Sequence, residues 1–393
     1  MNRCDVAIVG AGLTGLAAAI GLAEQGRKVV VVDPRPPTMP EPSAAISLRV
    51  STFSPASRSF LEALGAWRRV PVTRSFGFSR MSVWEDDPAR ALFFDAGDAG
   101  RDTLGHVVEN ETAQAALWDR AAECCDLVSA AVDTIELEDR SARLTLDDGS
   151  RLKTQVLVGA DGGRSRVRAA AHIEVKAHDY FQSGVVTVVD TEHPHGGTAR
   201  QRFLDGYPLA LLPLGDRQVS IVWSQPTSTA RRLVGVEAED FTERLQAASQ
   251  HVLGMLRAPG QRAAFPLRRQ SAVRYARGST VLIGDAAHQV HPLAGQGANI
   301  GLLDAAALIE CLEGANDPVL ALRRYERWRR SDAELMSFGI HCIGAAYRLP
   351  GLAGSARRLG TATVNAIPGL TGLFTRHASG LGGRVPRLAR PRR

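Results

Sequence analysis

A glycine-rich turn near the start of the chain constrains the fold more than any other feature. Gly10, Gly12 and Gly15 form the pattern G-x-G-x-x-G. A β-branched apolar run at 5–9 precedes the turn, and an alanine- and leucine-rich run at 16–25 follows it. A strand, a tight turn and a helix in this order predict the opening of a βαβ unit.

The segment after the predicted helix completes the unit. Residues 28–32 form a continuous apolar run, as in strands of a buried parallel sheet, and Asp33 follows it. In such units the glycines let the backbone approach a pyrophosphate at the helix N-terminus, where free N–H groups favour anions. Asp33 is placed to bind ribose hydroxyls. The motif therefore predicts a dinucleotide cofactor, without separating NAD from FAD.

Two later segments also place an aspartate directly after a strand. Asp161 follows an apolar run at 155–158, and Gly284-Asp285 follows a second one. Between them, residues 183–224 contain short apolar runs separated by turn residues, a pattern typical of an antiparallel sheet. We expect helices at 237–253, 298–313 and 318–347.

This order predicts a discontinuous cofactor domain that is interrupted by a sheet domain. We place the cofactor domain at 1–67, 99–172 and 275–347. The substrate domain with its antiparallel sheet takes 68–98 and 173–274, and a basic, partly helical tail takes 348–393.

The segments together resemble a known family, the flavin-dependent aromatic monooxygenases of the para-hydroxybenzoate hydroxylase fold. Within it, the run from His291 to Asp304 looks like the signature H-P-x-x-G-Q-G-x-N-x-G-x-x-D of ubiquinone-biosynthesis hydroxylases, the UbiH/UbiF/VisC group. One departure is Glu111, where many relatives carry Arg, and we expect Glu111 to face away from the cofactor. Further similar stretches lie at 48–51, 104–110, 265–267, 325–327 and 380–381.

The resemblance implies a fold class and an activity. The fold is α/β, with a Rossmann-like FAD-binding domain, an inserted antiparallel-sheet substrate domain and a helical C-terminal tail. The implied cofactor is FAD, with NADH or NADPH as reductant and O2 as co-substrate. The implied activity is hydroxylation of a polyprenylphenol ring in ubiquinone biosynthesis. Two alternatives stay open: a hydroxylase or epoxidase of the same fold with another aromatic or natural-product substrate, and a non-catalytic FAD-binding subunit of a quinone-biosynthesis complex.

The resemblance also assigns residues to the flavin. Asp285 would bind the ribityl chain, Asp161 would lie near the pyrophosphate, and Arg49 and Gln114 would reach the cofactor. The glycines around the start of the helix at 298–313 would bring N–H groups close to the flavin ring, and the helix N-terminus would stabilise negative charge on reduced flavin. The expected cofactor-binding residues are Gly10, Gly12, Gly15, Asp33, Arg49, Gln114, Asp161, Gly284, Asp285, Gly295, Gly297, Ala298 and Asn299. The expected catalytic residues, as the ring environment, are His291, Pro292 and Gln296.

No metal site is expected. His288 and His291 are close in sequence, but no carboxylate or cysteine joins them at ligand spacing. The five cysteines include no C-x-x-C pair, which is typical of a reduced, cytosolic chain.

Charge is distributed unevenly along the chain. The net charge is +6, yet residues 335–393 contain nine arginines and no lysine or acid, which leaves −3 for residues 1–334. The tail could meet an anionic membrane surface or another quinone-biosynthesis protein, or simply be solvated. No nucleic-acid-binding module is recognisable, so nucleic acid is not expected as a partner. No apolar window is long enough to span a bilayer, so no spanning helix is expected. We expect a cytoplasmic protein from its cysteines, and peripheral membrane association from its basic tail.

Overall fold

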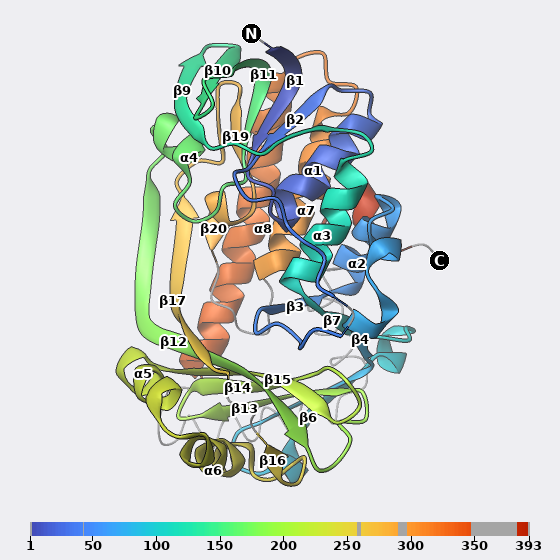
Figure 1. Ribbon diagram of the computed structural model, residues 1–393, viewed down its shortest axis with the longest axis vertical. Helices are drawn as coiled ribbons and strands as arrows, with labels where there is room; N and C mark the ends of the chain where they lie inside the picture. Colours follow the sequence, from blue (N-terminus) through green and yellow to red (C-terminus); the bar gives the residue numbers. More distant parts are fainter. Residues whose placement is uncertain (1, 42, 258–260, 290–296, 347–382, 392–393) are drawn as a thin grey trace.

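The computed structural model describes residues 2–41, 43–257, 261–289, 297–346 and 383–391, with 335–346 described by their backbone alone. Its elements form two large sheets at opposite ends of the molecule, joined by long helices and by a strand ribbon along one side (Figure 1). The predicted fold class is confirmed for the cofactor and sheet parts. The domain boundaries remain a prediction, and most of the tail lies outside the described residues.

The first sheet has a parallel centre in the order β19–β11–β1–β2–β8. All four valines of β2 are buried, which is why this strand carries no polar alternation. An antiparallel hairpin, β9–β10, extends the start of β11. The strands are β1 (Asn2–Val9), β2 (Val29–Val32), β8 (Asp126–Val128), β9 (Val132–Glu138), β10 (Ser141–Leu146), β11 (Arg151–Gly159), β18 (Ala276–Arg277) and β19 (Thr280–Leu282).

Helices pack against this sheet. Gly21 lets α7 approach α1 closely, because a Cβ on Gly21 would lie 2.3 Å from Ile309 Cδ1. Ser54 caps α2 by accepting a hydrogen bond from the Ser57 N–H, and Pro55 occupies the first helical position, where proline is favoured. The helices are α1 (Leu13–Glu24), α2 (Pro55–Ala63), α3 (Asn110–Ala121), α4 (Arg166–Ala170), α7 (Gly297–Leu312) and α8 (Pro318–Ala346).

The second sheet is mostly antiparallel, in the order β20–β17–β12–β15–β14–β13–β5–β6. One face is covered by α5 (Thr227–Gly235) and α6 (Ala238–Ser249), whose apolar side chains pack on β12, β14 and β15. The other face turns toward a three-stranded sheet of β3 (Val50–Phe53), β7 (Gly105–Glu109) and β4 (Ser75–Phe78). The strands are β5 (Arg80–Trp84), β6 (Leu92–Asp95), β12 (Val175–Thr191), β13 (Thr198–Leu204), β14 (Tyr207–Pro213), β15 (Gln218–Pro226), β16 (Leu256–Arg257), β17 (Ala263–Ala272) and β20 (His288–Gln289).

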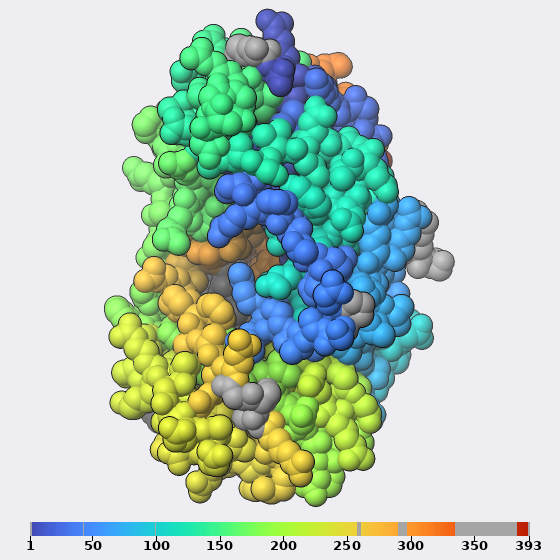
Figure 2. Space-filling view, in the orientation of Figure 1, coloured from blue at the N-terminus to red at the C-terminus, as the bar shows by residue number. Residues whose placement is uncertain are grey.

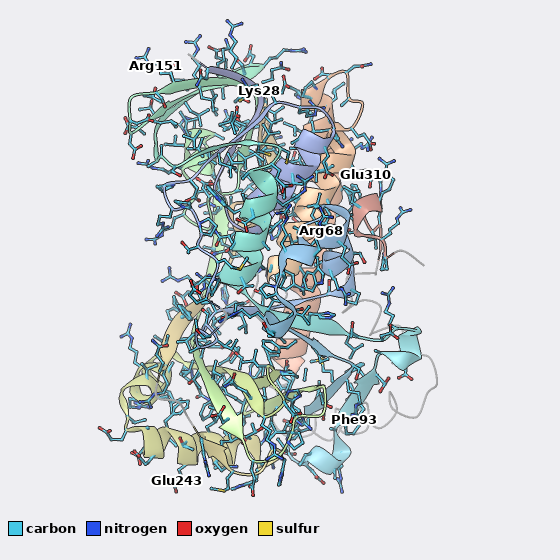
Figure 3. The ribbon with its side chains drawn as sticks, turned by 45° about the vertical axis from the view of Figure 1, so that its right-hand side comes forward. Lys28, Arg68, Phe93, Arg151, Glu243 and Glu310 are labelled. Carbon is cyan, nitrogen blue, oxygen red and sulfur yellow. The ribbon has the colours of Figure 1, made fainter. Side chains whose placement is uncertain are left out.

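The end of the chain returns to the body of the molecule. The short 3₁₀ turn η7 (Arg387–Ala389) packs against α2 and α7, and Ala389 is fully buried there. Arg384 lies 4.0 Å above the Trp328 ring and pairs with Glu310, while Arg387 pairs with Glu310 and Glu313. Figure 3 shows Glu310 beside this segment. These two arginines therefore neutralise body acids instead of projecting from a free basic tail.

Candidate active site

The glycines of the first turn differ in what a side chain would meet. Gly10 has φ +107°, and a Cβ there would lie 2.3 Å from the Ala160 carbonyl oxygen. A Cβ on Gly15 would lie 2.1 Å from the Gly10 carbonyl oxygen. A Cβ on Gly12 would meet no atom within 4 Å. Gly10 and Gly15 thus permit close backbone packing, and Gly12 leaves open space at the start of α1.

The start of α1 is available to an anion. Gly12 is its N-cap, no side chain caps it, and its first turn holds no acid. Asp33 Oδ2 accepts a hydrogen bond from the Ala11 N–H at 2.8 Å, and Gln114 Nε2 donates to the Ala11 carbonyl at 2.7 Å. The structure therefore brings Asp33 and Gln114 together at the glycine-rich turn.

Asp161 is held at the start of α4. Its Oδ2 accepts hydrogen bonds from the N–H groups of Arg166 at 2.6 Å and Val167 at 3.2 Å. Its Oδ1 is buried and has no hydrogen-bond partner among the described residues. A buried acceptor of this kind is one that a ligand donor or an ordered water would satisfy.

The Gly284–Asp285 turn, η5 (Gly284–Ala286), lies against the first turn. Gly284 has φ +57°, and a Cβ there would lie 2.9 Å from Thr14 Oγ1. A Cβ on Gly301 of α7 would lie 2.5 Å from the same oxygen, so η5 and the start of α7 both meet the first turn at Thr14. The Asp285 side chain is exposed and accepts a hydrogen bond from Gln289 Nε2 at 3.1 Å. Asp285 is thus fixed in place and open to a ligand.

Arg168 joins the two aspartate-bearing turns, a role that the sequence pattern does not reveal. Its guanidinium is largely buried and donates to the carbonyls of Ala286 at 2.9 Å and Gly163 at 2.7 Å. The pKa of Arg168 is lowered by burial, which the charge of Asp161 partly offsets. Its partners lie outside any local motif, so only the three-dimensional structure identifies this contact.

The start of α7 carries the remaining expected cofactor residues. Gly297 and Ala298 are half-buried in its first turn. Asn299 is buried, accepts from the Ser54 N–H at 2.9 Å and donates to the Thr52 carbonyl at 2.7 Å, so it fastens α7 to β3 and α2. The other expected members, His291, Pro292, Gly295 and Gln296, lie outside the described residues.

Arg49 is exposed and directly precedes β3 in the chain. Its carbonyl accepts the Asn110 N–H at 2.9 Å, and no partner is found for its guanidinium in the described parts of the chain. Glu111, in the first turn of α3, is exposed, where an acid is favourable to the helix dipole.

A buried ion pair shapes the loop before Arg49. Arg74 Nη1 lies 2.6 Å from Glu109 Oε2, and both side chains are almost fully buried. Arg74 Nη2 also donates to the carbonyls of Glu41 and Ala44, and Glu109 Oε1 accepts the Ser47 N–H. Sequence reasoning missed this pair, because nothing local indicates that Arg74 is buried.

The described residues fit FAD. An uncapped helix start with open space at Gly12, a buried oxygen of Asp161 without a partner and an exposed Asp285 lie around one region. Figure 2 shows the surface hollowed between the blue segment near residue 40 and the orange and yellow segments that include β17 and α7. His288 is buried and bonded to Asp304, and no group of three or more metal-binding side chains occurs in the described ranges.

The comparisons with known proteins define the class. The model of the family described as FAD binding domain matches residues 3–336, so this chain belongs to that family. It is 34% identical over 355 residues to the 3-demethoxyubiquinol 3-hydroxylase of Escherichia coli (strain K12), covering 87% of this chain and 90% of that protein. It is 34% identical over 405 residues to the ubiquinone hydroxylase UbiL of Rhodospirillum rubrum, covering 98% and 92%.

A solved structure shows the same fold. The p-nitrophenol 4-monooxygenase PnpA from Pseudomonas putida DLL-E4 superposes with a TM-score of 0.77 at 20% identity, covering 98% of this chain and all of that one. The predicted family, FAD as cofactor and flavin-dependent monooxygenase class are confirmed. The individual site residues remain predictions.

Proposed function

We propose that this protein is an FAD-dependent monooxygenase that hydroxylates the ring of a polyprenylphenol intermediate in ubiquinone biosynthesis. The observation that carries the proposal is the convergence of the glycine-rich turn, Asp161 and Asp285 on one region beside an apolar sheet face. The names of the two relatives above, which are similar over most of their length, support the substrate class.

The chain would hold FAD by three of its segments. The N–H groups at the start of α1 would bind the pyrophosphate, Asp33 would bind a ribose, and Asp285 would bind the ribityl hydroxyls. FAD, when bound and reduced by NADH or NADPH, supplies the activation of O2. The protein positions the ring and excludes water.

An apolar wall supports a lipid-soluble substrate. A cluster lies between the three-stranded sheet and the face of the second sheet that α5 and α6 do not cover. Several of its apolar side chains are only partly buried, so they offer surface to a ligand. These partly buried members are Ile46, Leu48, Val50, Phe76, Met81, Leu104 and Leu212.

Membrane or partner association is the less direct part of the proposal. Among the described residues, no helix combines the length and apolar character needed to cross a bilayer. Four of the nine tail arginines, Arg348, Arg357, Arg358 and Arg376, precede the docked end of the chain. We assign the contact with an anionic surface or a quinone-biosynthesis protein to these four, since Arg384 and Arg387 are paired with body acids.

Purified protein tests the reaction. With NADH or NADPH, isotopically labelled O2 and a prenylated phenol, we expect phenol-stimulated oxidation of the nicotinamide and one labelled oxygen in the ring product. Tight FAD binding without turnover of any prenylated phenol would instead favour a non-catalytic FAD-binding subunit. Turnover of unprenylated aromatics alone would favour a hydroxylase of another pathway.

A further inference from the structure

A buried charged cluster behind the Gly284–Asp285 turn has no part in the function described so far. Asp304 of α7 is fully buried. Its Oδ2 accepts hydrogen bonds from the Gly284 N–H at 3.0 Å and from His288 Nε2 at 2.6 Å. Its Oδ1 accepts from Arg329 Nε of α8 at 2.8 Å. One carboxylate thus joins η5, β20, α7 and α8.

We propose that Asp304 is a positioning residue for FAD, which holds the Gly284–Asp285 turn and the start of α7 in the geometry that binds the cofactor. This rests on the FAD site of the proposed function and adds to it a residue that lies behind the cofactor-binding turn. Asp304 does not face the cofactor region itself, since its oxygens are taken by Gly284, His288 and Arg329. It acts through the Gly284 backbone, one residue before Asp285.

The geometry explains why a carboxylate is needed here. Gly284 is buried in a turn with φ +57°, and a buried N–H must find a hydrogen-bond acceptor. A charged acceptor makes a stronger hydrogen bond than a carbonyl does, and it fixes the turn more firmly. Burial raises the pKa of Asp304, but His288 and Arg329 lower it more, so that its pKa falls below the usual value. The acceptor is therefore ionised at neutral pH.

The cluster also joins the two described ends of the segment between β20 and α7. His288 lies in β20, and Asp304 lies about two turns into α7. Strand β20 pairs with β17 through Gln270–Gln289 and Ser271–His288. The cluster around Asp304 is therefore connected to the second sheet. A displacement of His288 from Asp304 would move both the Gly284–Asp285 turn and the edge of the second sheet.

The other groups around the cluster are structural neighbours. The Tyr275 ring lies 5.6 Å from the His288 ring, and the Tyr275 N–H is bound by Glu326. Tyr325 donates to the Leu282 carbonyl. Asp332, on the outer side, binds Arg329 Nη1 at 2.8 Å but touches neither Gly284 nor His288. It therefore offers a matched control, which perturbs the same guanidinium without loosening the turn.

The test compares five variants as purified holoenzymes, the fifth being Asp285→Ala, and flavin fluorescence follows the release of FAD on dilution. We expect Asp304→Asn and His288→Leu to release FAD at least about tenfold faster than the wild type and to show an altered absorption spectrum of the bound flavin. His288→Gln, which keeps a side-chain donor, and Asp332→Asn should both stay within about threefold of the wild-type rate.

Each outcome decides the proposal. Loss of a buried partner can prevent folding, and if Asp304→Asn is insoluble the pair of His288 variants decides alone. Wild-type release rates and spectra in Asp304→Asn and His288→Leu, with only a lower melting temperature, would reduce the cluster to a core ion pair and overturn the proposal. So would unchanged release from an Asp285→Ala protein, because the turn would then not bind FAD. A failure to hydroxylate any phenol leaves this test unaffected.

Discussion

At the scale of single residues, some residues shape the backbone of the site and others would contact the cofactor. Gly10, Gly15 and Gly284 permit close packing, whereas Asp285 is exposed and Asp33 is partly exposed. The sequence predicts the glycines and aspartates, because their types recur at fixed spacing after strands. It does not predict Arg168 or Arg74, since their partners are set by the tertiary fold.

The glycines of the first turn give a direct comparison. Gly15→Ala should lower the free energy of unfolding by about 1–3 kcal/mol, because its Cβ would overlap the Gly10 carbonyl. Gly12→Ala should leave the unfolding of FAD-free protein unchanged, yet weaken FAD binding, because its Cβ enters the open space. Urea unfolding and FAD titration separate the two effects, and equal destabilisation by both substitutions would contradict this account.

Asp285 provides the test of the ribityl site. Asp285→Ala should weaken FAD binding about ten- to hundredfold, since a hydrogen bond to a charged acceptor contributes about 1.5–3 kcal/mol. The exposed Asp119 of α3 supplies a control, Asp119→Ala, which should bind FAD as the wild type does. Full FAD occupancy in the purified Asp285→Ala protein after dialysis would remove Asp285 from the site.

His106 should make stability depend on pH. Burial, aided by the charge of Arg58, lowers its pKa from 6.5 to about 4. The folded state thus disfavours protonation, so stability is complete above pH 6.5 and falls as the pH decreases toward 4. In His106→Gln this part of the pH dependence should disappear. Urea unfolding across that range checks it, and parallel curves for the two proteins would contradict the assignment.

At the scale of elements, the regular patterns are the predictable part. The βαβ opening, the helices α6, α7 and α8, and the strands β12 to β15 of the second sheet lie close to their predicted positions. The length of β12 was not predicted, because its first residues are exposed and pair with β17, which follows about 80 residues later. Helix α5 was missed as well. The packing of the end of the chain against α2 and α7 could not be predicted, since its arginines resemble those of a solvated tail.

The docked end predicts two separable functions of the basic tail. Deleting 384–393 should lower the melting temperature, because it removes the buried Ala389 and the Arg384–Trp328 contact, without changing binding to anionic vesicles. Replacing the four arginines from Arg348 to Arg376 by Gln should do the reverse. Vesicle sedimentation and thermal unfolding distinguish the deletion from the arginine variant. Loss of vesicle binding in the deletion alone would contradict the assignment of surface binding to the four arginines.

At the scale of the whole molecule, the two large sheets are joined directly at the candidate site. Strand β20 follows the Gly284–Asp285 turn and pairs with β17, which continues into the second sheet (Figure 1). The cofactor turn is therefore linked through β20 and β17 to the second sheet, which forms one side of the apolar wall. The sequence predicted both parts and their order, but it could not predict this connection, because β20 has only two residues.

The central claim is hydroxylation of a ubiquinone precursor, and deletion of the gene tests it most directly. Mass spectrometry of the lipid extract should show less ubiquinone and the accumulation of one prenylated precursor that lacks a ring hydroxyl. Plasmid-borne wild type should restore the pool, and Asp285→Ala should not. A normal quinone pool without any accumulated precursor, in a strain with no second hydroxylase of this family, would contradict the account.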